Sequence, residues 1–135
     1  MRARVSYKQD FLLKIIKDEK YSACRNELEF KKKNLKNWFS NKKFFSFCIE
    51  TAQTIWGFPD VLVFDREQEK TYYIEYKFTN TGIIKFQPTQ IAFFKKYKDL
   101  GVICISYNKK NKNVYVFDVE NFVHDTTLDL EKDLG

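Results

Sequence analysis

The segment GFPDVLVFDREQEKTYYIEYK, residues 57–77, places three charged residues at or within two runs of strand-forming residues. Asp60 follows Pro59 at the start of the run DVLVF, whereas Glu75 and Lys77 lie inside the run TYYIEYKF. Val, Ile, Tyr and Phe favour β-strands, and the polar stretch DREQEK between the runs can turn the chain. The segment therefore predicts an antiparallel hairpin that carries charged side chains within its strands.

The position of the turn decides which residues of this hairpin face each other. If the turn centres on residues 67–68, the numbers of paired residues sum to 135, and Asp60 faces Glu75 with β-carbons about 5 Å apart. A one-residue bulge would shift this register. Alternation puts Tyr73, Glu75 and Lys77 on the same face as Asp60. The opposite face then carries apolar and aromatic side chains, namely Val61, Val63, Tyr72, Ile74 and Tyr76.

Two facing carboxylates repel each other, and burying either one unpaired costs several kcal/mol. A divalent cation removes the repulsion, because Mg²⁺ takes oxygen ligands, usually one or two carboxylates completed by water and substrate phosphate. Lys77 lies about 7 Å along the strand from Glu75, where its amine can reach a metal-bound water or a phosphate. The trio can therefore hold a cation, a nucleophilic water and a phosphodiester together.

The rest of the chain predicts one mixed domain. Its 135 residues, 44% of them hydrophobic, suit a single core. A stripe of Leu28, Leu35, Trp38 and Phe39 indicates a helix over 25–39, while Pro88 and Gly101 suit the start and end of another. We expect helices over 11–20, 25–39 and 88–100, and strands over 44–50, 60–64, 71–78, 102–107 and 114–119. A strand–helix–strand crossover predicts an α/β architecture, and residues 121–135 are expected to form a short helix and a loose acidic end.

The spacing of "PD" and the later "EYK" resembles the motif of the PD-(D/E)xK nuclease superfamily. The order of three segments is similar to that in VRR-Nuc-like, Holliday-junction-resolvase-like and phage-borne members: GFPDVLVF, then YYIEYK, then FQPTQIAFFKKYKDLGV. The resemblance covers residues 27–120. It implies one nuclease domain over 1–135 with the restriction-endonuclease-like fold, a mixed β-sheet flanked by helices. The other interpretation is a hairpin whose charged side chains are merely exposed.

The resemblance also implies roles for residues of the hairpin. Asp60 and Glu75 would be metal ligands, together with the backbone carbonyl of Tyr76, for Mg²⁺ or a substituting Mn²⁺. Lys77 would orient or activate the attacking water, although it could instead be a surface lysine paired with Glu75. Gln90 would position Lys77 or a phosphate; alternatively it satisfies backbone donors of the first helical turn.

The family usually adds a carboxylate from the helix that precedes the first strand. Glu27 fits the spacing of the family best, ahead of Glu50 and then Glu29, and each of the three could equally be solvated.

The net charge of +6 is uneven, because residues 1–117 carry 23 basic and 12 acidic side chains. Basic clusters with interleaved aromatic residues suit a polyphosphate partner, although a Lys/Asn-rich proteome produces the same count. Phosphate contacts would make binding depend on salt. The lysines expected to bind DNA are Lys31, Lys32, Lys33, Lys85, Lys95 and Lys96.

These observations predict a Mg²⁺-dependent DNA endonuclease that acts on branched DNA such as a Holliday junction. We expect a homodimer, because resolvases cut two symmetric strands, and a chain this short leaves hardly any room for a base-reading domain. One alternative is a non-catalytic nucleic-acid-binding module on the same fold. Another is a protein that blocks a host system through protein contacts.

The cysteines and the histidine indicate neither a zinc site, nor a disulfide framework, nor a His-rich metal site. Cys24, Cys48 and Cys104 are widely spaced and suggest buried thiols in a reducing compartment, and the one histidine, His124, is expected at the surface. No apolar stretch approaches the roughly 20 residues that span a bilayer, and no signal peptide is evident. We expect the protein to be located in the cytoplasm. If this Lys-, Asn- and Phe-rich chain belongs to a phage, that is the cytoplasm of the host cell.

Overall fold

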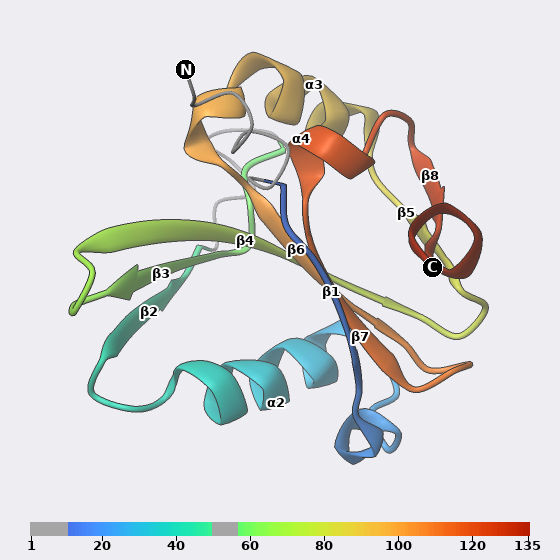
Figure 1. The fold of residues 1–135 in the computed structure, drawn as a ribbon, viewed down its shortest axis with the longest axis horizontal. Helices are drawn as coiled ribbons and strands as arrows, with labels where there is room; N and C mark the ends of the chain where they lie inside the picture. Colours follow the sequence, from blue (N-terminus) through green and yellow to red (C-terminus); the bar gives the residue numbers. More distant parts are fainter. Residues whose placement is uncertain (1–10, 50–56) are drawn as a thin grey trace, which may run out of the picture.

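The computed structural model describes residues 11–49 and 57–135 and shows a central twisted β-sheet with helices on both faces (Figure 1). Helix α2 (Glu27–Phe39) lies on one face, and α3 (Pro88–Lys96) and α4 (Val119–Phe122) lie on the other. The sheet has six strands in the order β1-β7-β6-β4-β3-β2. Their bounds are β1 (Leu13–Lys17), β2 (Phe44–Cys48), β3 (Val61–Asp65), β4 (Lys70–Thr79), β6 (Ile103–Asn108) and β7 (Asn113–Asp118).

The connection through α3 makes this sheet mixed. β4 and β6 pair in parallel, whereas the other neighbouring pairs of the six-stranded sheet are antiparallel. Antiparallel strands can be joined by a tight turn, but parallel strands need a crossover, which α3 and the short η2 (Lys98–Leu100) supply. The predicted helix start at Pro88 is confirmed, but the α-helix ends at Lys96, earlier than predicted. Gly101, with a left-handed φ of 64°, ends the 3₁₀ turn η2 that follows. The predicted α/β architecture is confirmed as well.

The β3–β4 hairpin has the predicted register, with Val61 opposite Ile74 and Leu62 opposite Tyr73. β3 begins at Val61, but β4 continues to Thr79. Beyond Glu75, therefore, no described strand pairs with β4 on the β3 side. This open edge of β4 is where side chains from both faces of the sheet can meet.

Two hydrophobic cores lie on opposite faces of the sheet. The core under α2 contains Val61, Val63, Ile74 and Tyr76, as the predicted alternation requires. Tyr73 packs against the other core, which lies under α3. The predicted stripe on α2 is wrong in one member, because Leu28 is 52% exposed. The buried line of α2 passes instead through Phe30 and Asn34, and a buried Asn is invisible to an apolar pattern.

The helix predicted over 11–20 is wrong. Residues 13–17 form β1, which pairs antiparallel with β7. η1 (Glu19–Tyr21) is one short 3₁₀ turn, and Asp18 is its N-cap. The run LKIIK fits a strand as well as a helix, and β-branched Ile15 and Ile16 favour the strand once a partner is present. That partner lies about a hundred residues away in the sequence, so the local pattern could not reveal it.

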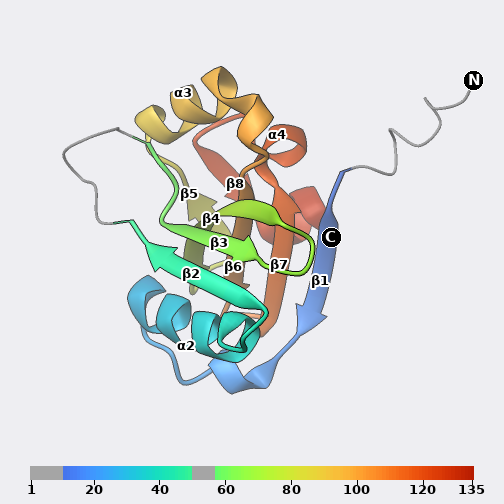
Figure 2. The same ribbon diagram turned by 90° about the vertical axis from the view of Figure 1, so that its left-hand side faces the viewer.

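The C-terminal end is packed, which corrects the expectation of a loose acidic end. β8 (Thr127–Asp129) pairs with β5 (Ile83–Lys85) in a separate two-stranded sheet, and η3 (Leu130–Leu134) follows (Figure 2). Leu128, Leu130 and Leu134 are buried in the core under α3. These leucines alternate with acidic residues, so the acidic side chains face outward while the segment still contributes apolar area.

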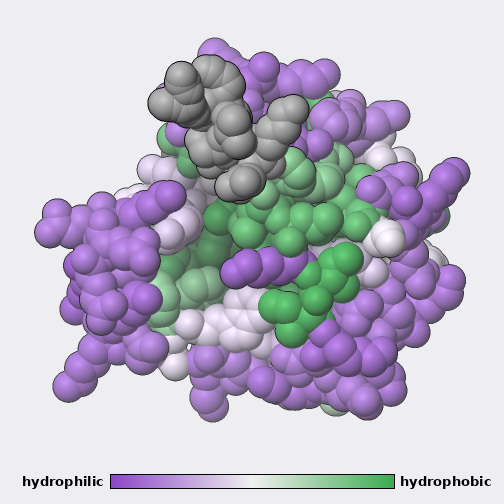
Figure 3. All heavy atoms as spheres, viewed as in Figure 1, coloured by the Kyte–Doolittle hydropathy of each residue, from purple (hydrophilic) through white to green (hydrophobic). Residues whose placement is uncertain are grey.

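Surface residues agree only in part with expectation. His124 is exposed as predicted, whereas Cys48 is an exposed thiol because it ends the edge strand β2; Cys24 and Cys104 are buried. Apolar residues gather at the centre of one face, bordered by hydrophilic residues (Figure 3). Within the described ranges, no helix has the length and apolar character needed to cross a membrane.

Candidate active site

The segment before β3 is fixed against the start of α3. Gly57 has a φ of 85°, and a β-carbon there would collide with the backbone carbonyl of Thr89. Phe58 packs edge-on against Tyr73 and Phe93, with ring centroids 5.9 and 5.2 Å apart. A residue with a side chain could not bring the chain this close to α3, so Gly57 and Phe58 together position Asp60.

Asp60 extends the β3–β4 ladder with its side chain. Its Oδ2 accepts a hydrogen bond of 3.1 Å from the backbone N–H of Tyr76, which lies beyond the last paired residues of β3 and β4. Its backbone carbonyl accepts from the N–H of Ile49 at 2.8 Å. The structure therefore brings Asp60 beside β4 at the level of Glu75, as the register predicts.

Gln90 joins Glu75 to Lys77. Gln90 Nε2 donates to Glu75 Oε2 at 2.8 Å, and Gln90 Oε1 accepts from Lys77 Nζ at 3.2 Å. The same Oε1 accepts from the backbone N–H of Gln87 at 2.8 Å, so Gln90 contacts Lys77 and also satisfies a backbone donor at the start of α3. Lys77 Nζ also lies 3.8 Å from Glu75 Oε2 and 4.8 Å from the centre of the Phe86 ring.

Glu75 is a buried carboxylate with one oxygen that lacks a partner. The residue is 2% exposed, and Oε1 has no hydrogen-bond partner in the structure. The pKa of Glu75 is raised to about 8, chiefly by burial and then by the nearby Asp60 and Glu27, against the opposing effects of Lys77 and Gln90. Such an oxygen requires a proton or a cation at neutral pH.

The pKa of Asp60 is also raised, chiefly by burial, against the opposing effects of the Tyr76 N–H, Lys31 and Lys77. Glu27, in the first turn of α2, is exposed, yet partial loss of hydration and the charge of Asp60 raise its pKa, while Lys77 and Lys31 lower it. Glu27 and Lys31 both belong to α2, and their charges interact with that of Asp60.

Glu29, another candidate acid, is engaged with a different partner. Glu29 forms an ion pair of 2.7 Å with Arg25 and also accepts from its backbone N–H. Glu50 lies outside the described residues. Of the two candidates that the structure describes, Glu27 is the one whose charge interacts with those of Asp60 and Glu75.

A buried polar network that the sequence did not reveal fixes α2 on the sheet. The Tyr76 hydroxyl donates to Asn34 Oδ1 at 2.7 Å, and Asn34 Nδ2 donates to the Tyr21 hydroxyl at 3.0 Å. Tyr76 points away from Asp60, into the core under α2. Any metal contact from Tyr76 would therefore come from its backbone carbonyl, and that role stays a prediction.

The oxygen atoms of this site suit a cation that brings its own water. No three His, Cys, Asp or Glu side chains in residues 11–49 and 57–135 are grouped so as to hold a metal by themselves. Asp60 and Glu75 nevertheless offer two carboxylates, one with a free oxygen, and Mg²⁺ needs only one or two carboxylates when water and phosphate complete its shell. The residues present fit that ion.

The lysines predicted to bind DNA do not form one group. Lys31 lies near Asp60, and Lys32 is exposed on α2. The Lys33 side chain points toward η1, because its amine donates to the backbone carbonyl of Lys20. Lys85 is exposed on β5, one residue before Phe86.

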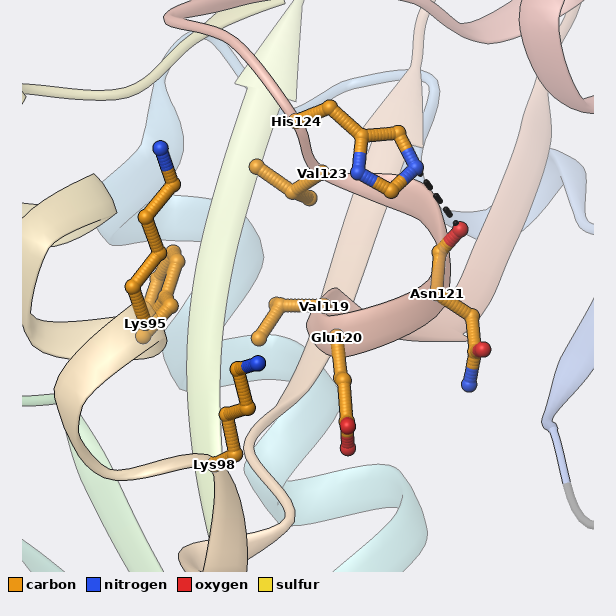
Figure 4. A pocket seen from close by; sticks show the side chains of 8 residues that line it. Lys95, Lys98, Val119, Glu120, Asn121, Val123 and His124 are labelled. Atoms are coloured by element: carbon orange, nitrogen blue, oxygen red, sulfur yellow. Dashed lines mark hydrogen bonds between the residues drawn. The ribbon is translucent and has the colours of Figure 1, made fainter.

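Lys95 and Lys96 lie at the opposite end of α3 from Gln90. Lys95 lines a hollow between α3 and α4 together with Lys98, Glu120 and His124 (Figure 4), and the amine of Lys96 lies over the Tyr97 ring. The structure does not bring these two lysines to the carboxylates.

Comparison with known proteins establishes the fold. Neither a family model nor a curated protein sequence matches the chain. The structure is similar to that of Hjc, a Holliday junction resolvase from the archaeal hyperthermophile Archaeoglobus fulgidus, with a TM-score of 0.54 and 12% sequence identity. The match covers 77% of this chain and 87% of Hjc. The predicted restriction-endonuclease-like fold is thereby confirmed.

Proposed function

We propose that this chain is a Mg²⁺-dependent DNA endonuclease of the PD-(D/E)xK type that acts on branched DNA. One observation carries the proposal: the buried Glu75, with an oxygen that lacks a partner, lies beside Asp60 and Lys77 at the open edge of β4. A chain that only packs or binds gains nothing from burying two carboxylates together. A cation-dependent site at a sheet edge, where a phosphodiester can approach, accounts for the cost.

Each residue of the site has a distinct task. Asp60 and Glu75 would hold Mg²⁺ or Mn²⁺, with the Tyr76 carbonyl as a further ligand. When bound, the cation lowers the pKa of a coordinated water and neutralises phosphate charge. Gln90 holds Glu75 and Lys77 in register, and Lys77 orients the water or stabilises charge growing on the phosphate. Glu27 would orient water from the α2 side.

Branched DNA is the proposed substrate for two reasons. The similar structure, Hjc, is a Holliday junction resolvase. The described residues form one sheet layer with its helices and a small β5–β8 sheet, and none of them forms a second domain that could read bases. A homodimer would present two such sites to symmetric strands. The phage origin and the cytoplasmic location remain predictions.

The test compares an end-labelled four-way junction with a linear duplex of the same sequence, in Mg²⁺, in Mn²⁺ and in EDTA. Asp60→Asn removes the ligand charge and keeps an acceptor for the Tyr76 N–H. Asp65→Asn is the matched control, because Asp65 is a buried carboxylate at the other end of β3, paired with Lys43.

We expect the wild type and Asp65→Asn to cut the junction symmetrically with metal and not in EDTA, and Asp60→Asn to bind the junction without cutting it. Equal cleavage of both substrates would remove the branch selectivity. If neither substrate is cut in either metal while binding persists, the endonuclease proposal fails and the non-catalytic binding module becomes the better account.

A further inference from the structure

Three lysines, from the end of β1, from α2 and from the β6–β7 turn, hold their amines on backbone carbonyls. Lys17 Nζ donates to the carbonyl of Asn111 at 2.8 Å, Lys33 Nζ to that of Lys20 at 2.6 Å, and Lys109 Nζ to that of Cys24 at 2.9 Å. A carbonyl has no net charge, so each ammonium keeps its full positive charge while its position is fixed. We call Lys17, Lys33 and Lys109 the lysine cluster.

The charge of this region comes from the lysine cluster. Three neighbouring cations are each matched by a carboxylate: Lys20 with Asp18, Arg25 with Glu29, and Lys112 with Glu19. Burial raises the pKa of the Cys24 thiol, and both Lys33 and Lys109 lower it, which places the two amines near the same sulfur. η1 lies beside α2 below the sheet, within a hydrophilic margin of the molecule (Figures 1 and 3).

Strand pairing gives the spacing between the lysine cluster and the candidate active site. β4 runs from Glu75 past Lys77 to Thr79, whose carbonyl accepts from the N–H of Lys109 at 2.9 Å. Lys77 pairs with Ser106, so Lys109 lies three residues, or about 10 Å, further along the sheet.

We propose that the lysine cluster binds the phosphate backbone of a duplex DNA arm whose scissile phosphate lies at Asp60, Glu75 and Lys77. This inference rests on the proposed function, and it places the arm over the first turn of α2 and the turn between β6 and β7. Lysine amines held in fixed positions can contact phosphates, and such contacts do not distinguish one base from another. An acidic protein is a poorer match, because Tyr21 and Cys24 are buried and the surface offers mainly charge.

The test measures how binding depends on salt. Anisotropy of a labelled linear duplex is followed over a range of KCl concentrations without divalent metal, in an Asp60→Asn background. Lys17→Gln, Lys33→Gln and Lys109→Gln are combined in one variant. The control combines Lys36→Gln, Lys42→Gln and Lys70→Gln, which removes the same charge from exposed positions at the other end of α2 and around the hairpin.

We expect the slope of log K against log salt to decrease by about 0.9 for each lost phosphate contact in the cluster variant and to stay unchanged in the control. Equal changes in both variants, or none in the cluster variant, would overturn the inference. Lys33→Gln alone, on exposed α2, gives the same readout for one contact if the triple variant melts early. Competition by polyglutamate as strong as that by DNA of equal charge would overturn the choice of DNA.

The two proposals fail in different ways. If the cluster variant loses its slope but the wild type never cuts any DNA with Mg²⁺ or Mn²⁺, the binding surface stands and the nuclease proposal falls. If the wild type cuts the junction but the cluster variant keeps its salt slope, the nuclease proposal stands and the binding surface falls.

Discussion

Gln90 links the acidic and basic parts of the candidate site. Its amide oxygen accepts from Lys77 Nζ and from the N–H of Gln87, so its amide nitrogen must point to Glu75. One side chain therefore fixes the direction of a carboxylate and an ammonium group. A partner of this kind orients groups without itself touching the reacting atoms.

The first prediction concerns Gln90→Ala. The variant leaves both oxygens of the buried Glu75 without an amide partner, and the Lys77 amine loses its fixed direction. The single-turnover rate of junction cleavage should fall by roughly 10–100-fold with little change in KM, as for other groups that orient metal ligands. Gln87→Ala is the control, since its backbone N–H remains, and an unchanged rate for Gln90→Ala would contradict this positioning role.

The second prediction concerns pH. The folded pKa of Glu75, about 8, lies above its ordinary value of 4.5, so its contribution to the stability of the metal-free protein is full below pH 4.5 and is lost as pH rises through 8. Glu75→Gln stays neutral and should lose less stability between pH 5 and pH 8, a difference of a few kcal/mol at most. Urea unfolding in EDTA measures it, and parallel pH profiles for the two proteins would refute it.

At the scale of elements, the hairpin was predictable because its polar turn is short and its strands alternate. These two features fix the pairing of Val61 with Ile74 and the shared face of Glu75 and Lys77. β1 was not predictable, because LKIIK fits two periods and its partner β7 is distant in the sequence. Local pattern decides an element only where its partner is local too.

The candidate site was predictable in part for the same reason. Asp60, Glu75 and Lys77 follow from the register of one hairpin, and Gln90 follows from the start of one helix. The interaction of Glu27 with Asp60 depends on how α2 packs on the sheet. That packing is a tertiary feature, so the sequence could only rank Glu27 among alternatives.

The third prediction tests the segment that positions Asp60. Gly57→Ala would push a methyl group into the carbonyl of Thr89 and strain a φ of 85°, so we expect it to lower the free energy of unfolding by roughly 2 kcal/mol or more. Gly101→Ala is the control, because its φ is also positive but nothing lies within 4 Å of the added carbon. Urea unfolding compares the two, and an equal loss would show that the close approach to α3 does not matter.

At the scale of the whole molecule, the C-terminal segment belongs to the core under α3. Leu130 is fully buried there, although acidic residues surround it in the sequence. The sequence did not predict this packing, because the net charge of the tail outweighs its few leucines in any local average. The C-terminal segment supplies three leucines to this core and the strand β8 that pairs with β5.

The fourth prediction follows from that burial. Leu130→Ala should lower the free energy of unfolding by about 2–5 kcal/mol, the usual range for a buried leucine. Leu28→Ala, at a site that is 52% exposed, should change it far less. Thermal or urea unfolding of the metal-free protein provides the comparison, and a Leu130 variant as stable as the Leu28 variant would mean that the end is loose after all.

The central claim is that Asp60 and Glu75 form one cation site, and titration calorimetry with Mn²⁺ at pH 8 tests it without any DNA. We expect the wild type and Asp65→Asn to bind Mn²⁺, and both Asp60→Asn and Glu75→Gln to lose that binding while remaining folded. Binding that survives in both site variants, or is absent from the wild type, would contradict the claim.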